Sequence, residues 1–190
     1  MTVLRIITGS AKGKKLKTLE GEATRPTSDR IKEAVFSAIQ FDIADRRVLD
    51  LFAGSGQLGL EALSRGAASA MFIDSAREAV EIVKENARNT GFADVSKYLV
   101  SDWRNYIRKA SGRIEFDLVF VDPPYAMECS EDAARRLAAA GLLAKGAIVV
   151  LECGEEEPNL GEADGFEIIK STHYGKKTYV MILLYRGCEE

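Results

Sequence analysis

The residues best suited to chemistry form a glycine turn that follows a predicted strand. Residues 48–52 indicate a buried strand, residues 54–56 a tight turn, and residues 58–65 a helix that ends at Gly66. In such a turn, backbone N–H groups can approach a polar ligand closely. Asp50 lies just before the turn, and its carboxylate would favour a cationic ligand group over a pyrophosphate. The segment therefore predicts a ligand site built from backbone N–H groups and an acid.

The same turn also satisfies the dinucleotide-binding pattern G-x-G-x-x-G, from Gly54 to Gly59. Asp74 follows at the end of the next predicted strand, where an acid can bind the ribose of NAD or FAD. Asp50 argues against that ligand, because a buried carboxylate beside a pyrophosphate is repulsive. It suits instead the ammonium or sulfonium region of S-adenosylmethionine (SAM).

A second polar segment, Asp122-Pro123-Pro124-Tyr125, directly follows the apolar residues 116–121. On its own it could be a turn that ends a strand, since proline cannot continue the ladder. Here it falls at the carboxyl end of a predicted parallel strand, where α/β proteins bind ligands. Asp122 and the Pro123 carbonyl can accept hydrogen bonds from an exocyclic base amine, and proline keeps these acceptors preorganised. Tyr125 can stack on a flipped base, a contact worth about 1–3 kcal/mol.

The two segments in this order resemble the Rossmann-type amino-methyltransferases, and further motifs resemble the bacterial RsmD family. The similarity covers most of residues 4–125 and is carried by Arg5-Ile-Ile-x-Gly9, Lys12-Gly-x-Lys-Leu16, Arg25-Pro-Thr-Ser-Asp-Arg-Ile-Lys-Glu-Ala-Val-Phe36, residues 49–66 and Asp122–Tyr125. The resemblance implies a SAM-dependent enzyme, without a metal, that methylates N2 of guanine 966 in 16S rRNA during small-subunit maturation.

The resemblance also assigns roles to individual residues. Catalysis falls to Asp122, Pro123, Pro124 and Tyr125. The cofactor residues it implies are Asp50, Phe52, Ala53, Gly54, Ser55, Gly56, Asp74, Ser75, Asp102 and Trp103. Asp74 would bind the ribose hydroxyls, and Asp102 either the adenine amino group or the start of the next helix. The expected RNA contacts are Arg5, Lys12, Lys14, Lys15, Lys17, Arg25, Thr27 and Arg30.

Predicted strands and helices alternate, which indicates a Rossmann-like, class I SAM-dependent methyltransferase fold. We expect one domain over 1–190, with a mostly parallel seven-stranded sheet whose last strand is antiparallel. Residues 46–190 would form the SAM-binding catalytic core. Residues 1–45 would add a basic hairpin (4–8 and 15–19) and a helix from about 29 to 41, with Thr27 or Ser28 as its N-cap. A capping box at Ser75–Glu78 predicts the start of a helix that ends before Gly91.

Composition sets the broad class of the protein. With 46% apolar and 29% charged residues in 190, the chain suits a globular domain. No long apolar segment or signal peptide is evident, and the cysteines (Cys129, Cys153 and Cys188) lack metal-site spacing. We therefore expect a cytoplasmic monomer, without membrane or metal, whose partner is 16S rRNA or the assembling 30S subunit.

The net charge of −3 conceals a basic N-terminal segment, 1–19, and an acidic segment, 152–167. The basic segment is compatible with a phosphate-binding face or with a solvated lysine-rich hairpin. His173 is expected to be a surface residue near a turn.

Three other functions remain open from the sequence. An adenine-N6 or cytosine-N4 nucleic-acid methyltransferase shares the D-P-P-Y segment, although such enzymes generally carry an additional recognition region. A non-catalytic SAM- or nucleotide-binding module in ribosome assembly, or an NAD-dependent reductase, would use the glycine turn alone.

Overall fold

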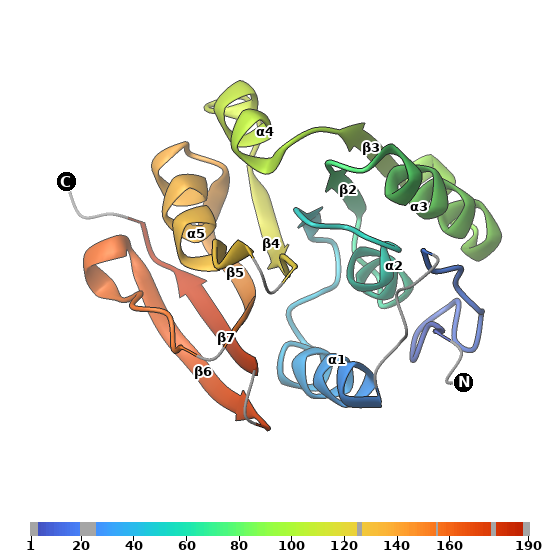
Figure 1. Cartoon of the computed structure of the whole chain (residues 1–190), viewed down its shortest axis with the longest axis horizontal. Helices are drawn as coiled ribbons and strands as arrows, with labels where there is room; N and C mark the ends of the chain where they lie inside the picture. Colours follow the sequence, from blue (N-terminus) through green and yellow to red (C-terminus); the bar gives the residue numbers. More distant parts are fainter. Residues whose placement is uncertain (1–3, 20–25, 125–126, 155, 176–177, 188–190) are drawn as a thin grey trace. The chain divides into compact units, whose positions relative to one another are not determined.

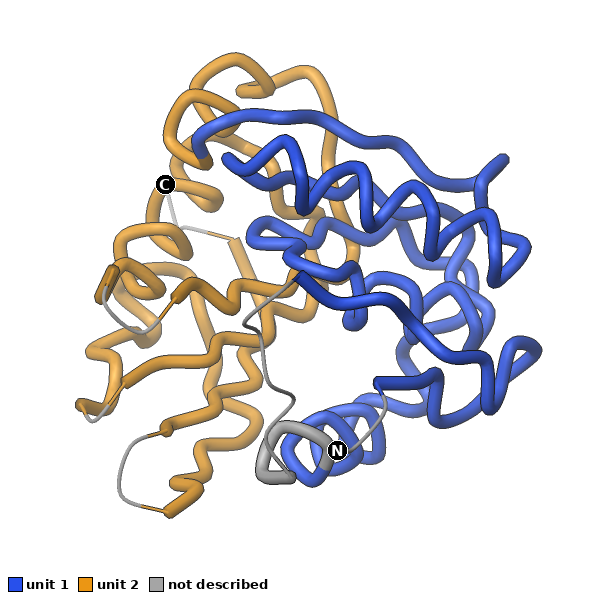
Figure 2. The backbone as a smooth tube through the Cα atoms, turned by 45° about the vertical axis from the view of Figure 1, so that its right-hand side comes forward, with its two compact units in different colours: residues 1–102 blue, residues 103–190 orange. Residues whose placement is uncertain are grey.

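The structure is a computed structural model that describes residues 4–19, 26–124, 127–154, 156–175 and 178–187. For residues 26–29 it describes the backbone alone. The chain divides into two compact units, residues 1–102 and 103–190 (Figure 2). Each unit is described by itself below.

Unit 1 is built on three parallel strands, each followed or preceded by a helix (Figure 1). The strands are β1 (Arg47–Asp50), β2 (Ser69–Asp74) and β3 (Ser96–Val100), in the order β3-β2-β1. Helix α2 (Gln57–Ser64) packs on β1 and β2, and α3 (Arg77–Thr90) packs on β2 and β3. The sequence favours this arrangement because each helix has an apolar face, as in α3, where Val80, Val83 and Ala87 are buried. A short 3₁₀ helix, Ala93–Val95, leads into β3.

The predicted basic hairpin is present in unit 1, but it is shorter than expected. Its two arms meet in a single antiparallel bridge between Arg5 and Lys15. Backbone bonds from Ile6 N to Lys14 O (3.0 Å) and from Leu16 N to Leu4 O (2.9 Å) support that bridge. Two bonds of this kind do not extend a ladder, so the loop depends on the rest of the unit for its position.

Two predicted helix starts are wrong. Helix α1 covers Pro26–Ala38, so Thr27 and Ser28 lie inside it and neither is the N-cap. Proline is favoured at a first helical position, where its missing N–H costs nothing. Helix α3 has Ala76 at its N-cap with no side-chain cap, so the capping box at Ser75 does not form. The predicted end of α3 is confirmed, because Gly91 takes the left-handed conformation with φ 90°.

Unit 2 contains four strands in the order β4-β5-β7-β6. They are β4 (Phe116–Val121), β5 (Leu143–Cys153), β6 (Phe166–Tyr174) and β7 (Thr178–Tyr185). β4 and β5 are parallel, whereas β7 is antiparallel to both β5 and β6. Helix α5 (Ser130–Ala139) packs on β4 and β5, α4 (Trp103–Ala110) packs on α5, and the short 3₁₀ helix Glu162–Asp164 precedes β6.

The expected fold class is confirmed: the strands of the described residues form a seven-stranded, mostly parallel sheet with an antiparallel last strand. The core consists of the central strands and the inner faces of their helices. In β4, five of the six residues are buried, as expected for a strand that is covered on both faces. Among the helices of the described residues, none combines the length and apolar character needed to cross a membrane.

Candidate functional site

The glycine turn between β1 and α2 forms as predicted. Gly56 in the turn and Gly59 just after it are required because a larger residue would clash with neighbouring side chains. Gly56 has φ 78°, and a Cβ atom there would lie 2.9 Å from Val83 of α3. A Cβ atom on Gly59, one helical turn later, would lie 2.4 Å from the ring of buried Phe72. The turn is therefore packed directly against α3 and β2, and its backbone stays close to the ends of the strands. Ala53 and Ser55 in the turn are buried, and Phe52 is half-buried.

Asp50 is buried at the end of β1, with 2% of its surface exposed. Its Oδ2 accepts a hydrogen bond from the Gly59 N–H at 3.0 Å, which fixes the first turn of α2 to the strand. Burial raises the pKa of this carboxyl group, the Gly59 bond opposes that effect and the neighbouring Asp74 charge adds to it, so that the pKa is about 7. This supporting role of Asp50 was not predicted from the sequence.

Asp74, at the end of β2, holds the other side of the turn. One carboxylate oxygen accepts the Gly54 N–H at 2.9 Å, and the other accepts the Ala76 N–H at 2.8 Å. Asp74 thus does at the start of α3 what Ser75 was expected to do; Ser75 itself is exposed. Each carboxylate oxygen has two lone pairs, so Asp74 keeps acceptor capacity for ligand hydroxyls.

Asn86 of α3 links the glycine turn to the basic hairpin. Its Nδ2 donates to the Ser55 carbonyl at 2.9 Å and to the Lys17 carbonyl at 3.0 Å, and its Oδ1 accepts the Lys17 N–H at 2.8 Å. Asn86 has no exposed surface. A buried side-chain amide that satisfies three backbone groups fixes their relative positions, because each group would otherwise be left without a partner.

Helix α2 holds the other arm of the hairpin through polar residues that sequence reasoning did not single out. The fully buried Glu61 carboxylate accepts the N–H groups of Ile7 (2.7 Å) and Thr8 (3.0 Å) and pairs with Arg65 (2.8 Å). Ser64 Oγ donates to the Thr8 carbonyl at 2.6 Å. Nothing in the sequence around Glu61 and Ser64 indicated that their hydrogen-bond partners lie more than fifty residues away in the chain.

The expected RNA contacts differ in how far they are already engaged. Lys14 Nζ donates to the last carbonyls of α3, at Asn89 (3.0 Å) and Thr90 (3.2 Å), and Lys17 pairs with Glu85 at 2.5 Å. Those two ammonium groups would have to exchange partners to bind a phosphate.

The other basic residues are more accessible. Arg5, Lys12 and Lys15 are exposed on the hairpin, and Arg30 is exposed on α1. Arg25 and the Thr27 side chain lie outside the described residues.

The D-P-P-Y segment begins directly after β4, as predicted. Asp122 is half-buried, Pro123 is buried, and the Pro124 carbonyl accepts the Met127 N–H at 2.8 Å, which closes a turn. Tyr125 lies outside the described residues. The parallel register pairs Val121 of β4 with Leu151 of β5, so Asp122, directly after β4, and Glu152, the second-last residue of β5, fall at the same edge of the unit 2 sheet.

Cys153 follows Glu152 at this edge of unit 2. Burial, together with the charges of Glu152, Glu131 and Asp122, raises the pKa of the Cys153 thiol to about 11, although a hydrogen bond with Ser130 lowers it. The thiol therefore stays protonated at neutral pH and is a poor nucleophile.

The last two residues expected to bind the cofactor, Asp102 and Trp103, lie where the chain divides into the two units. Asp102 is exposed at the end of unit 1, after β3. Trp103 begins α4 and is buried, with Arg104 stacked over its ring at 4.2 Å.

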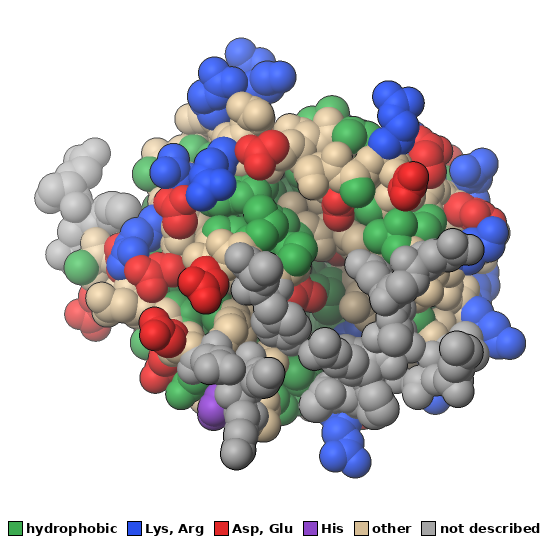
Figure 3. All heavy atoms as spheres, in the orientation of Figure 1, with side chains coloured by type: hydrophobic (Ala, Val, Ile, Leu, Met, Phe, Trp, Pro, Cys, Tyr) green, Lys and Arg blue, Asp and Glu red, His purple; other side chains and the backbone are tan. Residues whose placement is uncertain are grey.

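The acidic segment has a structural role within unit 2. Arg135 of α5 pairs with Asp164 at 2.8 Å and with Glu131, and it donates to the Asn159 carbonyl at 2.6 Å. Figure 3 shows acidic side chains gathered over the part of unit 2 that contains β6 and α5. Arg135 therefore anchors this loop on α5, and the nearby Glu156, Glu157 and Glu162 are exposed.

Two further groups in the described part of the chain carry no sign of catalysis. His173 is exposed on β6, where its ring stacks on Tyr179 at 4.2 Å, so the predicted surface position is confirmed. Among the residues that the structure describes, no three potential metal-ligating side chains come together.

Comparisons with known proteins relate the chain to a family and to methyltransferases. The model of the family described as conserved hypothetical protein 95 matches residues 4–183. A putative rRNA methyltransferase YlbH of Bacillus subtilis is 41% identical over 123 residues, which cover 64% of this chain and 67% of that protein. The ribosomal RNA small subunit methyltransferase D of Haemophilus influenzae is 30% identical over 177 residues, 93% and 91% of the two chains. The solved structure of the putative methyltransferase yhhF from Escherichia coli superposes with a TM-score of 0.85 at 31% identity and covers 98% of this chain and 99% of that one.

Proposed function

The chain belongs to the RsmD family, the family of conserved hypothetical protein 95, and from this premise we propose that it methylates ribosomal RNA with SAM as the methyl donor. The acceptor we propose is the exocyclic N2 of a guanine in 16S rRNA, guanine 966 by the family resemblance, during maturation of the small subunit. The partner is 16S rRNA or the assembling 30S subunit, and the enzyme acts as a monomer in the cytoplasm.

The observation that carries the proposal is the pair of carboxylates on either side of the glycine turn. Asp50 fastens the turn from β1, and Asp74 fastens it from β2, while the Asp74 carboxylate keeps lone pairs that can accept from ligand hydroxyls. A pyrophosphate would face two carboxylates here, whereas a cationic ligand with ribose hydroxyls would be attracted.

An unsatisfied atom in the described residues also fits this ligand. Gln57 begins α2 directly after the turn, and its buried Oε1 has no hydrogen-bond partner among the described residues. A ligand ammonium group would supply the missing donor. Gln57, Asp50, Asp74 and Asp102 would thus hold SAM, with further contacts from the remaining turn residues.

When bound, SAM supplies a methyl group on a positively charged sulfur and leaves as S-adenosylhomocysteine. The guanine amine is a weak nucleophile, because its lone pair is delocalised into the ring. Asp122 and the Pro123 carbonyl would accept its two N–H groups and orient the nitrogen lone pair, and Asp122 would take the proton that the methylated nitrogen loses. Tyr125 would stack on the base, and most of the acceleration would come from this positioning.

The test is methyl transfer from radiolabelled SAM to small subunits from cells that lack the protein, to naked 16S rRNA and to duplex DNA, with mass mapping of the product. We expect methylation of a guanine in 16S rRNA and no methylation of duplex DNA. Asp122→Ala should lower kcat by roughly 100-fold or more while SAM affinity stays within a few-fold, because Asp122 acts on the acceptor. The control is Asp94→Ala, an exposed acid outside the site.

Each of the other outcomes would indicate a different function for this protein. Methylated DNA would favour an adenine-N6 or cytosine-N4 methyltransferase, and SAM binding without transfer would favour an assembly module. Tight binding of NAD without SAM would end the proposal, and an active Asp122→Ala variant would remove the acceptor role.

A further inference from the structure

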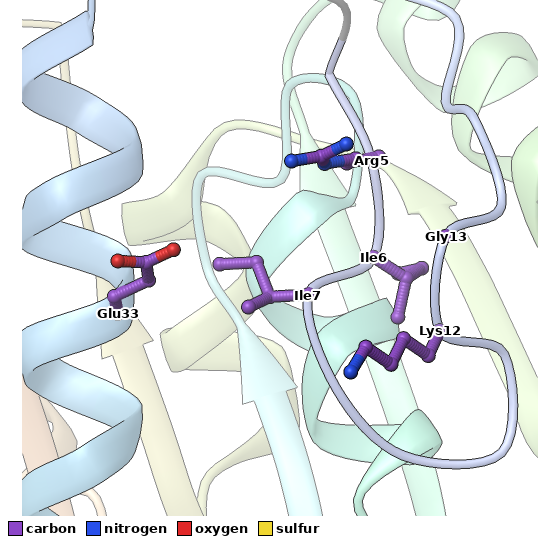
Figure 4. A pocket seen from close by; sticks show the side chains of 6 residues that line it. All are labelled: Arg5, Ile6, Ile7, Lys12, Gly13 and Glu33. Atoms are coloured by element: carbon purple, nitrogen blue, oxygen red, sulfur yellow. The ribbon is translucent and has the colours of Figure 1, made fainter.

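A pocket of about 210 Å³ lies in unit 1, between the basic hairpin and α1. Its lining residues come from both elements: Arg5, Ile6, Ile7, Lys12, Gly13 and Glu33. Figure 4 shows the Glu33 carboxylate facing the hairpin, and the side chains of Arg5, Ile7 and Lys12 extending from the hairpin on the side that faces Glu33. None of these residues belongs to the glycine turn or to the D-P-P-Y segment.

The pocket combines two cations, one carboxylate and an apolar wall. Arg5, Lys12 and Glu33 are exposed, Ile7 is half-buried, and Ile6 is fully buried below them. Within the described residues, no ion pair joins Glu33 to Arg5 or Lys12. Opposite charges that line one pocket without neutralising each other leave both kinds of charge available to a ligand that carries an anion and a hydrogen-bond donor.

The two walls of the pocket are held in place by buried contacts. Lys32, the neighbour of Glu33 on α1, is 2% exposed, and its Nζ donates to the Arg5 carbonyl at 3.1 Å. Glu61 binds the Ile7 and Thr8 N–H groups on the other side of the same arm. A pocket whose walls are already fixed loses little entropy when a ligand binds.

The size of the pocket limits what it can bind. Drug-sized ligands generally occupy pockets of roughly 300–1,000 Å³, so this one is too small for a second cofactor and holds at most one nucleotide, with part of that nucleotide outside it. Arg and Lys side chains bind phosphate, and a Glu carboxylate accepts a base amino group, as it does from cytosine N4. Unpaired RNA presents both groups together, because its bases are not engaged in a helix.

We propose that this pocket binds one unpaired nucleotide of the RNA substrate, with its phosphate on Arg5 and Lys12 and the exocyclic amine of its base on Glu33. This deepens the proposed function and rests on it for the identity of the RNA. In this pocket Glu33 of α1 would distinguish one base from another, whereas the hairpin alone would only attract the phosphates.

The experiment measures the affinity of the full chain for oligo(C) and oligo(U) of equal length, by fluorescence anisotropy at several salt concentrations. The two RNAs carry the same charge and differ at position 4 of the base, where cytosine has an amine and uracil a carbonyl oxygen. The protein should bind oligo(C) at least five-fold more tightly. Glu33→Ala should weaken oligo(C) binding and strengthen oligo(U) binding, because the repulsion of the uracil oxygen is removed along with the hydrogen bond to the cytosine amine.

Arg5→Gln and Lys12→Gln should weaken the binding of both RNAs and lower the salt slope by about 0.7 for each phosphate that the variant no longer neutralises. The matched controls are Glu156→Gln and Lys97→Gln, exposed charges that do not line the pocket. All four side chains are exposed, and unchanged thermal unfolding would show that the variants fold.

If Glu33→Ala strengthens the binding of both RNAs equally, Glu33 is only a charge near the RNA and the proposal is wrong. It is also wrong if Lys97→Gln lowers the salt slope as much as Lys12→Gln does. These measurements need neither SAM nor methyl transfer. If the protein prefers oligo(C) but does not methylate RNA, the proposed function is wrong and the proposed nucleotide pocket stands. If it methylates RNA but shows no preference for oligo(C), the proposed pocket is wrong and the proposed function stands.

Discussion

Asp50 shows how a residue of the proposed cofactor site can lower the stability of the folded protein. The carboxyl group is buried, and its pKa is raised to about 7 because burial penalises the charged form. The one bond that favours the charged form comes from the Gly59 N–H. A carboxylate without a cation in such a place is strained electrostatically, and a cationic ligand would relieve that strain.

This gives a prediction for stability against pH. Because the folded-state pKa of Asp50 lies above its usual 3.8, the folded protein holds this proton more tightly than the unfolded chain. The contribution of Asp50 to stability is therefore most favourable below pH 4 and declines as the pH rises to about 7. Asp50→Asn keeps the acceptor for Gly59 and lacks the charge, so it should become more stable than the original by on the order of 1–3 kcal/mol at pH 8.

Urea unfolding between pH 4.5 and 8 checks this prediction, with SAM affinity measured alongside. The Asn variant should gain stability with pH relative to the original while it loses SAM binding. A stability difference that does not change with pH would show that Asp50 is already charged at low pH.

At the scale of elements, α2 joins the two functional parts of unit 1. Its first residue follows the glycine turn, and its last turn carries Glu61 and Ser64, which hold the hairpin; Arg65, directly after the helix, pairs with Glu61. Asn86 of α3 makes a second link, between the Ser55 carbonyl and the backbone of Lys17. The hairpin has a single bridge of its own, so these contacts decide where the basic residues lie.

Glu61→Gln should therefore loosen the hairpin. Glutamine replaces one of the two acceptor oxygens by an NH₂ group that faces backbone donors, and it leaves Arg65 without its carboxylate. We expect a loss of about 2–4 kcal/mol of stability and faster hydrogen exchange at the Ile7 and Thr8 amides.

The control is Glu85→Gln. Glu85 also pairs with a base, Lys17, but both side chains are exposed, at 41% and 60%. Exposed pairs contribute little, so a loss of less than about 1 kcal/mol is expected. Equal losses in the two variants would mean that the Glu61 contacts do not anchor the hairpin.

At the scale of the whole molecule, the proposed tasks are divided between the two units. The cofactor residues from Asp50 to Asp102, the hairpin and the pocket belong to unit 1, whereas the D-P-P-Y segment belongs to unit 2. The most uneven charge is divided in the same way: the basic segment 1–19 is in unit 1, and the acidic segment 152–167, which Arg135 anchors on α5, is in unit 2. A net charge of −3 therefore does not argue against RNA binding.

Cofactor binding should reveal this division. SAM at 100 times its Kd should stabilise the chain by about 2.7 kcal/mol, since it binds the folded state alone. Hydrogen exchange should slow first in residues 50–102, where the proposed cofactor residues lie. NAD at the same concentration is the control and should change neither measurement. Protection confined to residues 103–190 would place the cofactor elsewhere.

Patterns within short segments determined most of the fold from the sequence. β4 begins and ends at the predicted residues, and α2 begins and ends one residue before its predicted bounds. Periodic burial and glycine stops act over a few residues, so they can be read without the partner elements. The glycine turn and its two acids, Asp50 and Asp74, were also evident, because each lies at the end of a predicted strand.

Only the tertiary structure decided what the polar residues of the helices do. Glu61 and Asn86 lie on helices where a polar side chain usually faces solvent, and their partners in the hairpin are more than fifty residues away in the chain. The same holds for Lys14 and Lys17. The sequence predicts that they bind RNA, but in the structure their ammonium groups bind residues of α3. A residue's type limits the bonds it can form, but the partner it finds depends on which segments the fold brings beside it.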